Sequence, residues 1–255
     1  MKIIFRLKRH HYVARVSVFL ITVALIAGMV GCGPTEVTFA DHNLEEAVRE
    51  AIGIHEGPIY PSDLVVLTSL NASSLSIADL TGLECATNLT DLSLSFNQIS
   101  DISPLTNLTS LTELYLWNNQ LGDITPLANL TSLTGLYLSS NQISDITLLA
   151  NLTSLAWLAL SDNQISDIAP LTNLTNLTEL YLSLNQISDI SPLTNLTNLT
   201  ELVLESNQII DISPLVDNEG LSLGDNVYIT GNPLSSDSIN IYIPQLEARG
   251  VLVIY

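Results

Sequence analysis

Seven aspartates stand at a fixed interval along the chain and are its most regular chemically active feature. They recur every 22 residues, as Asp79, Asp101, Asp123, Asp145, Asp167, Asp189 and Asp211. A column of carboxylates at such a spacing could bind calcium, which takes oxygen ligands. An aspartate at a turn or at a helix start more often accepts hydrogen bonds from nearby backbone N–H groups. We predict this capping role, and therefore no metal site and no cofactor.

The sequence contains no recognisable catalytic motif. Beyond residue 31 the only histidines are His42 and His55. There is no Cys and His spacing suited to zinc, no phosphate-binding glycine loop and no G-x-S-x-G. The regularly placed acids follow a repeat and do not form a unique pair. We predict that the protein is not an enzyme, and keep a hydrolase with a carboxylate pair on one face as an alternative.

The element that must position these side chains is a 22-residue repeat, and we call one repeat a rung. Its pattern is L-x-x-L-x-L-x-x-N-x-[IL]-x-D-I-x-[PL]-L-x-x-L. A fixed period of this length indicates a repeat architecture. The L-x-L segment alternates as a strand does, and parallel stacking would bury each row of leucines against the next. Ile143, Ile146, Leu149 and Leu152 are expected to point inward from the return segment.

The pattern resembles the leucine-rich repeat, in the 22-residue form of bacterial internalins, over residues 67–234 in about eight rungs. The resemblance implies an α/β solenoid, a horseshoe or arc with a parallel β-sheet on its concave face and short 3-10 or irregular segments on its convex face. It also implies adhesion or host-surface recognition. Ser-Pro at 103–104, 191–192 and 213–214 and Thr-Pro at 125–126 are typical of an N-cap followed by a first-turn proline.

One asparagine per rung is expected to form a ladder along the solenoid. An amide side chain has donors and an acceptor for the backbone of its own bend and of the neighbouring rung. After the sixth asparagine three residues are inserted before the next one. The predicted ladder comprises Asn97, Asn119, Asn141, Asn163, Asn185, Asn207 and Asn232.

Both ends of a solenoid need caps, because the end rungs would otherwise expose core. In residues 37–66 the segment "DHNLEEAVREAIG" predicts a helix that Asp41 or Asn43 caps and Gly53 ends. Its apolar stripe comprises Leu44, Ala47, Val48, Ala51 and Ile52. Residues 235–255 predict a C-terminal cap, with a helix that Pro244 kinks or restarts and Gly250 ends, and a last strand in "VLVIY". The inward face of that helix comprises Ile239, Ile243 and Leu246.

The first 31 residues read as an export signal. Five of the seven basic residues precede an apolar run from Val16 to Gly31. "MVGC" resembles the lipobox of bacterial lipoproteins, which implies a lipid on Cys32, a tether over residues 32–36 and a location at a cell membrane or outer surface. An ordinary signal peptide or an uncleaved anchor are the alternatives. With Cys32 acylated, no intramolecular disulfide would form, and Cys85 is expected to be a packed free thiol.

Removal of the signal would leave a strongly acidic protein. The remaining chain would contain two basic residues, Arg49 and Arg249, and 26 acidic residues, which gives a formal side-chain charge of −24. Such a surface repels nucleic acid and favours cationic partners. We therefore predict no nucleic-acid partner, and membrane contact only through the N-terminal lipid.

Three positions of each rung should form the concave face, because the third, fifth and seventh residues of L-x-x-L-x-L-x point out of the sheet. Aromatic side chains at these positions favour protein binding, and their acidic neighbours favour a basic partner. The alternative for the tyrosines is plain strand stacking. The predicted binding residues are Asp91, Glu113, Tyr115, Trp117, Tyr137, Trp157, Glu179, Tyr181, Glu201, Glu205 and Tyr228.

The sequence therefore predicts a lipid-anchored module at the cell surface that binds a protein, or alternatively a glycan, with its concave face. A structural or scaffolding envelope protein without a specific host ligand is the alternative function.

Overall fold

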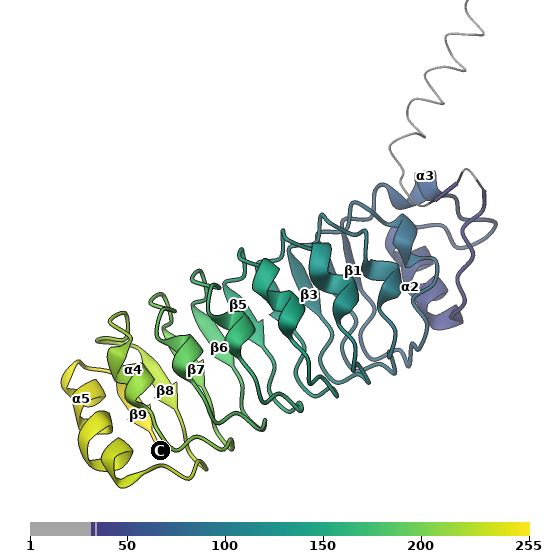
Figure 1. The fold of residues 1–255 in the computed structure, drawn as a ribbon. Helices are drawn as coiled ribbons and strands as arrows, with labels where there is room; N and C mark the ends of the chain where they lie inside the picture. Colours follow the sequence, from purple (N-terminus) through teal and green to yellow (C-terminus); the bar gives the residue numbers. More distant parts are fainter. Residues whose placement is uncertain (1–31, 34) are drawn as a thin grey trace, which may run out of the picture.

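The computed structural model describes residues 32, 33 and 35–255, so the predicted signal peptide lies outside the described residues. Within these residues nine strands form one parallel sheet in chain order, each paired with the next (Figure 1). Each strand has three residues, and β1 to β8 are centred on the first apolar residue of the L-x-L segment of their rungs, where the alternation predicts a strand. The strands are β1 (Ser69–Asn71), β2 (Asp91–Ser93), β3 (Glu113–Tyr115), β4 (Gly135–Tyr137), β5 (Trp157–Ala159), β6 (Glu179–Tyr181), β7 (Glu201–Val203), β8 (Asn226–Tyr228) and β9 (Leu252–Ile254).

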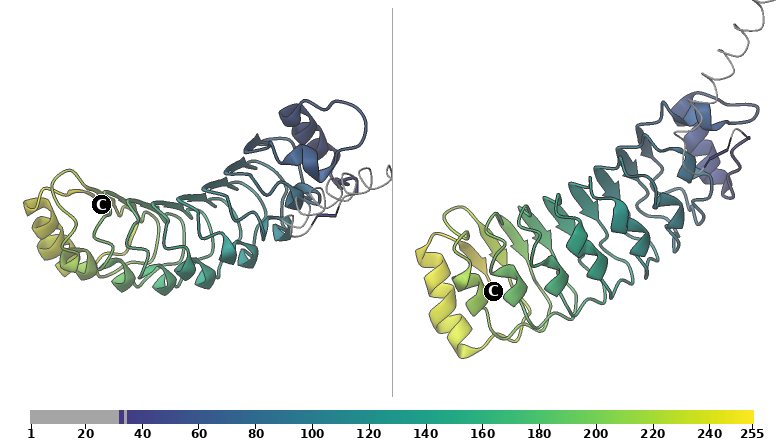
Figure 2. Two further views of the ribbon diagram at one scale, coloured as in Figure 1. Left: turned by 90° about the horizontal axis from the view of Figure 1, so that it is seen from above. Right: turned by 45° about the horizontal axis from the view of Figure 1, so that its top comes forward.

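Short helical segments form the face opposite the sheet, and the molecule is an arc with the sheet on its inner side (Figure 2). The predicted leucine-rich-repeat solenoid is confirmed. Most of these segments are single 3-10 turns, because the few residues between the sheet and the next rung leave no room for a long helix. They are η1 (Leu83–Cys85), η2 (Ser103–Leu105), η3 (Thr125–Asn129), η4 (Thr147–Asn151), η5 (Ala169–Leu171), η6 (Ser191–Leu193) and the α-helical turn α4 (Ser213–Asp217).

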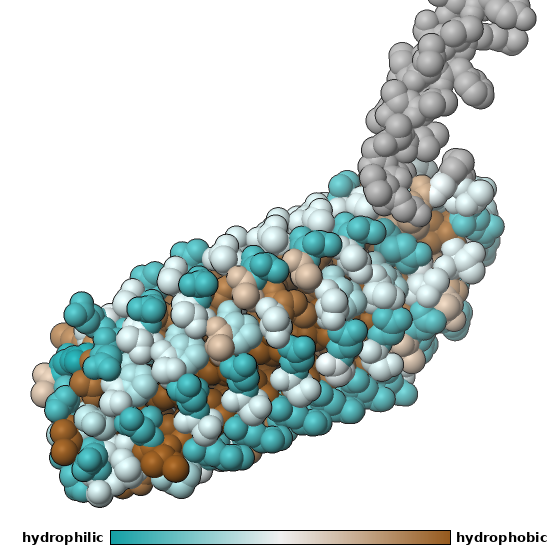
Figure 3. All heavy atoms as spheres, in the orientation of Figure 1, coloured by the Kyte–Doolittle hydropathy of each residue, from teal (hydrophilic) through white to brown (hydrophobic). Residues whose placement is uncertain are grey.

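The core lies between sheet and turns and consists of rows of leucine and isoleucine. Within one rung, Ile143, Ile146, Leu149 and Leu152 are all buried, as predicted from the repeat. Polar and apolar residues gather in rows along the length of the surface, because each rung repeats the same side chains (Figure 3). At roughly 25 cal/mol per Å² of apolar area removed from water, these stacked rows are the main source of stability.

The asparagine ladder joins neighbouring rungs through buried hydrogen bonds. Oδ1 of Asn163 accepts from the Ile143 N–H of the preceding rung at 3.0 Å. Its Nδ2 donates to the Leu138 carbonyl at 3.1 Å and to the Leu160 carbonyl at 3.0 Å. Equivalent bonds recur from Asn97 to Asn232, so the three-residue insertion leaves the ladder unbroken.

The aspartate column caps backbone turns. In each rung an aspartate Oδ1 accepts from the N–H two residues later, as Asp101 does from Ser103 at 2.8 Å. The hydrogen bond from the Thr125 side chain, then that from its backbone, lowers the pKa of Asp123, and Thr147 does the same for Asp145. The expectation that Ser or Thr of the Ser-Pro and Thr-Pro pairs is the N-cap is wrong. Those residues start the turn, and the aspartate two positions earlier supplies the oxygen.

The N-terminal cap contains α2 (His42–Ile52) and α3 (Pro61–Leu64). Of the two candidate caps, Asp41 is the one used, because its Oδ1 accepts from Asn43 and Leu44. Gly53 ends the helix at φ 70°, a conformation that favours glycine. Ala51 is exposed and does not belong to the predicted apolar stripe. Ile52, the next residue, is partly buried against the core, so Ala51 points to the solvent side of the last turn of α2.

The C-terminal cap contains a π-helical turn η7 (Ser238–Tyr242), then α5 (Ile243–Ala248), then β9, which pairs in parallel with β8. Pro244 lies in the first turn of α5, so it restarts the helix as predicted. Ile243 and Leu246 are buried, whereas Ile239 is 39% exposed. The prediction that Ile239 faces the core is wrong, because the wider π-turn changes the helical phase before α5.

Cys32 and Cys85 form a disulfide bond, which ties the start of the described chain to η1. The expectations of a free Cys85 thiol and of no intramolecular disulfide are therefore wrong in this structure. The two residues are far apart in sequence, and only the fold places their α-carbons 5.6 Å apart. A thioether lipid on Cys32 and this disulfide exclude each other, because both use the same sulfur. In residues 32–255 apart from Pro34, no helix is long and apolar enough to cross a membrane.

Candidate functional site

The strand register places the predicted binding residues in straight columns across the concave face. At the third position Glu113 lies beside Gly135, Gly135 beside Trp157, and Trp157 beside Glu179. At the fifth position Tyr115 lies beside Tyr137. In-register stacking of parallel strands puts like positions about 4.8 Å apart, so neighbouring side chains in a column touch.

Five aromatic residues of four consecutive rungs make two sets of ring contacts, and we call them together the aromatic cluster: Phe96, Tyr115, Trp117, Tyr137 and Trp157. Tyr115 and Tyr137 stack with ring centroids 4.4 Å apart. Trp157 meets Tyr137 edge-on at 6.4 Å, and Phe96 meets Trp117 edge-on at 4.3 Å. Trp117 is 40% and Trp157 46% exposed, so the cluster presents large apolar surface to a ligand.

Phe96 belongs to the cluster although it is not among the binding residues predicted from strand alternation. It occupies the eighth position of its rung, just before the ladder asparagine, and its backbone is left-handed with φ 56°. Non-glycine residues at this position share that conformation from Ser74 to Ser206. The left-handed turn places the Phe96 side chain against Trp117, the seventh residue of the next rung.

Acidic residues lie on both sides of the aromatic cluster. On one side Asp91 and Glu113 are direct cross-strand neighbours, and on the other Glu179 and Glu201 are. Like charges directly opposite each other destabilise a sheet. These pairs therefore do not serve stability, and their charge is available to a ligand.

Glu179 is held by a tyrosine of its own strand. The Tyr181 hydroxyl donates to Oε2 of Glu179 at 2.7 Å and approaches Oε1 of Glu201 at 3.5 Å. Burial raises the pKa of Tyr181, and its bond to Glu179 raises it further. Burial likewise raises the pKa of Tyr137, with added contributions from Tyr115 and the charge of Glu113.

The described residues supply no cation to this face. Arg49 bonds Glu45 at 2.7 Å within α2, and Arg249 donates to the Asn218 and Val216 carbonyls near the C-terminal cap. Lysine occurs only within the first eight positions of the sequence. The carboxylates of the concave face therefore have no basic side chain beside them in the part of the chain that the structure describes.

The remaining predicted binding residues lie in the same columns but outside the aromatic cluster. Tyr228 lies beside Val203, and Glu205 follows β7 at the seventh position. The structure thus places the predicted residues in columns of one face, brings Tyr115, Tyr137 and Trp157 into ring contact, and pairs Trp117 with Phe96.

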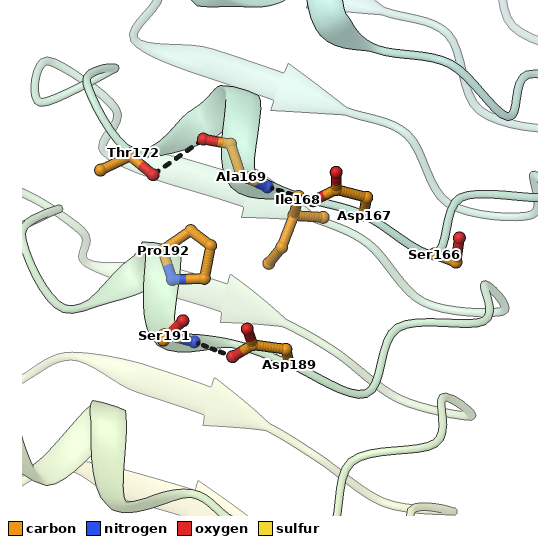
Figure 4. Close-up of a pocket in the computed structure, with 8 residues that line it drawn as sticks. All are labelled: Ser166, Asp167, Ile168, Ala169, Thr172, Asp189, Ser191 and Pro192. Atoms are coloured by element: carbon orange, nitrogen blue, oxygen red, sulfur yellow. Dashed lines mark hydrogen bonds between the residues drawn. The ribbon is translucent and has the colours of Figure 1, made fainter.

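A shallow depression of about 360 Å³ lies on the opposite face, between η5 and η6 (Figure 4). Asp167 and Asp189 line it, and each already caps a backbone N–H at 2.8 Å. The same residues recur in neighbouring rungs, so this depression is a consequence of the repeat. No cluster of three or more His, Cys, Asp or Glu suited to a metal ion occurs in residues 32–255, Pro34 excluded.

Comparison with known proteins identifies both the repeat and its near relatives. The family described as Leucine Rich repeats (2 copies) matches residues 87–129, 109–151, 131–173, 153–195 and 175–217. The structure of internalin C2 from Listeria monocytogenes is 35% identical with a TM-score of 0.76, over 87% of this chain and 97% of that one. The structure of an internalin, InlF, from the same species is 31% identical with a TM-score of 0.61, over 85% and 76%.

A third similar structure comes from a plant. It is the leucine-rich-repeat ectodomain of a membrane receptor kinase from Arabidopsis thaliana in complex with Casparian strip integrity factor 2. It is 29% identical with a TM-score of 0.59, over 68% of this chain and 22% of that one. A search of curated protein sequences finds no match.

Proposed function

The chain belongs to the leucine-rich-repeat family, in its internalin-like class, and from this premise we propose that it is an exported module that captures a basic protein on its concave face. Members of this family are generally binding modules and not enzymes. The observation that carries the proposal is the exposed aromatic cluster between two acidic pairs, on a face without a basic side chain among the described residues.

The physical argument follows from what each part contributes. Partly exposed aromatic rings give large contact area at low entropic cost and are frequent anchors of protein interfaces. Carboxylates around them attract a partner of opposite charge and exclude acidic ones. The plant receptor ectodomain is in complex with Casparian strip integrity factor 2, which agrees with a leucine-rich-repeat domain acting as a binding module.

Export is part of the proposal, and the Cys32–Cys85 disulfide supports it, because such bonds persist in oxidising compartments. A lipid anchor on Cys32 is the alternative to this disulfide, because both would use the Cys32 sulfur. Adhesion to a host surface is one setting for such a module, and recognition within the bacterial envelope is another.

Capture of soluble partners by the immobilised chain from Cys32 onward tests the function. Replacement of Tyr115, Trp117, Tyr137 and Trp157 by Ser should abolish capture of whatever the unaltered chain retains at moderate salt. Matched substitution of four exposed residues just past the ladder, Gln98, Gln120, Gln142 and Gln164, should leave capture intact. Equal capture by both variants would refute the proposal. Concentration-dependent self-association without any captured partner would favour the scaffolding alternative.

A further inference from the structure

One carboxylate of the concave face differs from all others there. Of the buried side-chain oxygens in residues 32–255, Pro34 aside, three have no hydrogen-bond partner, and Oε2 of Glu113 is the only charged one. The other oxygen, Oε1, accepts from the Thr134 hydroxyl at 2.8 Å. Glu113 as a whole is partly exposed, but this oxygen is buried and without a partner, which is costly, so a ligand that brings a donor would satisfy it.

The position of this carboxylate depends on Gly135. A Cβ built on Gly135 would overlap Oε2, so the carboxylate fills the space of the missing side chain. The φ of Gly135 lies outside the left-handed region, so its backbone does not require glycine. Every other rung carries a side chain at this position. A glycine inside a strand often marks a place where a ligand approaches closely.

Aromatic residues lie beside the Glu113 carboxylate and Gly135. Trp157 is the cross-strand neighbour of Gly135 on the side away from Glu113, and Tyr137 lies two residues along the same strand. Tyr137 and Trp157 meet edge-on, so their ring faces are not stacked on each other. A cation over an aromatic face gains from the ring quadrupole, most of all over tryptophan.

A second rung of identical sequence provides an internal comparison. Glu113-Leu114-Tyr115 in β3 and Glu179-Leu180-Tyr181 in β6 are the same tripeptide. In β6 the tyrosine hydroxyl satisfies the glutamate. In β3 Tyr115 stacks on Tyr137 instead, and the glutamate leans over Gly135 with one oxygen unpaired. The difference comes from the neighbouring rung and not from the tripeptide itself.

We propose that Glu113, Gly135, Tyr137 and Trp157 form a receptor for one arginine side chain of the protein ligand. A guanidinium group is planar, stacks on aromatic rings and presents several N–H donors in a fixed fork. It lies over the exposed Trp157 ring and donates to the Glu113 carboxylate. Rotation about the soft terminal torsion of Glu113 presents Oε2 to the incoming donor. Asp91, beside Glu113, adds to the negative field.

This inference rests on the proposed function and gives the chemistry of its ligand, but its test does not need the natural ligand. The probe is an acetylated and amidated Gly-Gly-Arg-Gly-Gly peptide, with a citrulline peptide as its neutral isostere. The readout is the pair of indole N–H signals in the NMR spectrum. Trp117 and Trp157 are the only tryptophans, and both lie on the concave face. A Trp157→Phe variant assigns the two signals.

The arginine peptide should shift the Trp157 signal in the full exported chain, with an affinity about tenfold above that of the citrulline peptide. Glu113→Gln should remove that preference. The control Glu247→Gln, an exposed glutamate of α5 in the C-terminal cap, should retain it within about twofold, because a charge more than a Debye length away is largely screened. Gly135→Ala, which displaces the Glu113 carboxylate, should lower the affinity for the arginine peptide at least as much as Glu113→Gln does.

Equal binding of both peptides, equal losses in Glu113→Gln and Glu247→Gln, or a shift confined to Trp117 would each overturn the arginine receptor. So would the absence of any shift at millimolar peptide. Suppose that one of these results is found while capture of a protein partner still depends on the aromatic cluster. The arginine receptor would then be refuted and the proposed function would stand. Loss of cluster-dependent capture would instead remove the proposed function itself.

Discussion

The carboxylate of Glu113 occupies the volume that a side chain on Gly135 would need, so the two residues are coupled across β3 and β4. Gly→Ala in a strand normally stabilises by roughly 0.5–1 kcal/mol where the backbone permits it. With Glu113 present, Gly135→Ala should lose that gain, because the new methyl group displaces the carboxylate. In a Glu113→Ala background the gain should appear. Urea unfolding of the four chains should give a coupling of about 1 kcal/mol, and additive effects would contradict the described overlap.

Asn163 should be the most sensitive polar residue of its rung. Asn163→Ala removes the bonds to Ile143 N–H and to the Leu138 and Leu160 carbonyls and leaves those groups buried. We expect the unfolding free energy to fall by about 2–4 kcal/mol, with an unchanged dependence on urea. The control is Asn151→Ala, which replaces an exposed asparagine at the end of η4. It should change the unfolding free energy by less than about 0.5 kcal/mol. Similar losses in both variants would mean that the ladder bonds contribute little.

The concave tyrosines should make the protein sensitive to alkali. Burial and the bond to Glu179 raise the pKa of Tyr181 above its ordinary value of 10.0. A raised pKa in the folded state gives stability that is complete below pH 10 and is lost as the pH rises toward the folded pKa, because the unfolded chain releases its proton first. The unfolding free energy should therefore fall as the pH rises above about 10. Tyr181→Phe should flatten this fall, and Glu179→Gln should reduce it in part. A fall of the same size in Tyr181→Phe would assign it to other groups.

Much of this architecture could be predicted from the sequence because a fixed period constrains every rung at once. The strand positions, the ladder from Asn97 to Asn232 and the inward isoleucines follow from repetition alone. The aspartate caps also follow, since seven equal positions need one common structural reason. The assignment of the cap to Ser103 failed because the turn begins one residue earlier than a standard N-cap would place it.

The candidate site was predictable only where strand alternation applies. Positions three, five and seven of each rung could be assigned to the concave face, but the alternation ends there. Phe96 reaches that face through a left-handed backbone that its residue type does not reveal. The orientation of Glu113 depends on the absence of a side chain on the next rung, which the sequence of β3 alone does not show. Residue-level geometry of this kind comes from contacts between rungs.

The state of Cys85 decides between the two possible fates of Cys32. The structure joins the two sulfurs, and we expect the exported chain to contain no free thiol. Alkylation after denaturation should therefore label no cysteine without reductant and two with it, since the chain has two cysteines. A lipid on Cys32 would instead give one labelled cysteine, Cys85, whether or not reductant is present, together with the added mass of the lipid on the N-terminal peptide. Closure of the loop between residues 32 and 85 should stabilise the N-terminal cap by up to about 4 kcal/mol, so Cys85→Ser should unfold at lower urea. Unfolding unaffected by both reductant and Cys85→Ser would show that the bond does not form in the exported protein.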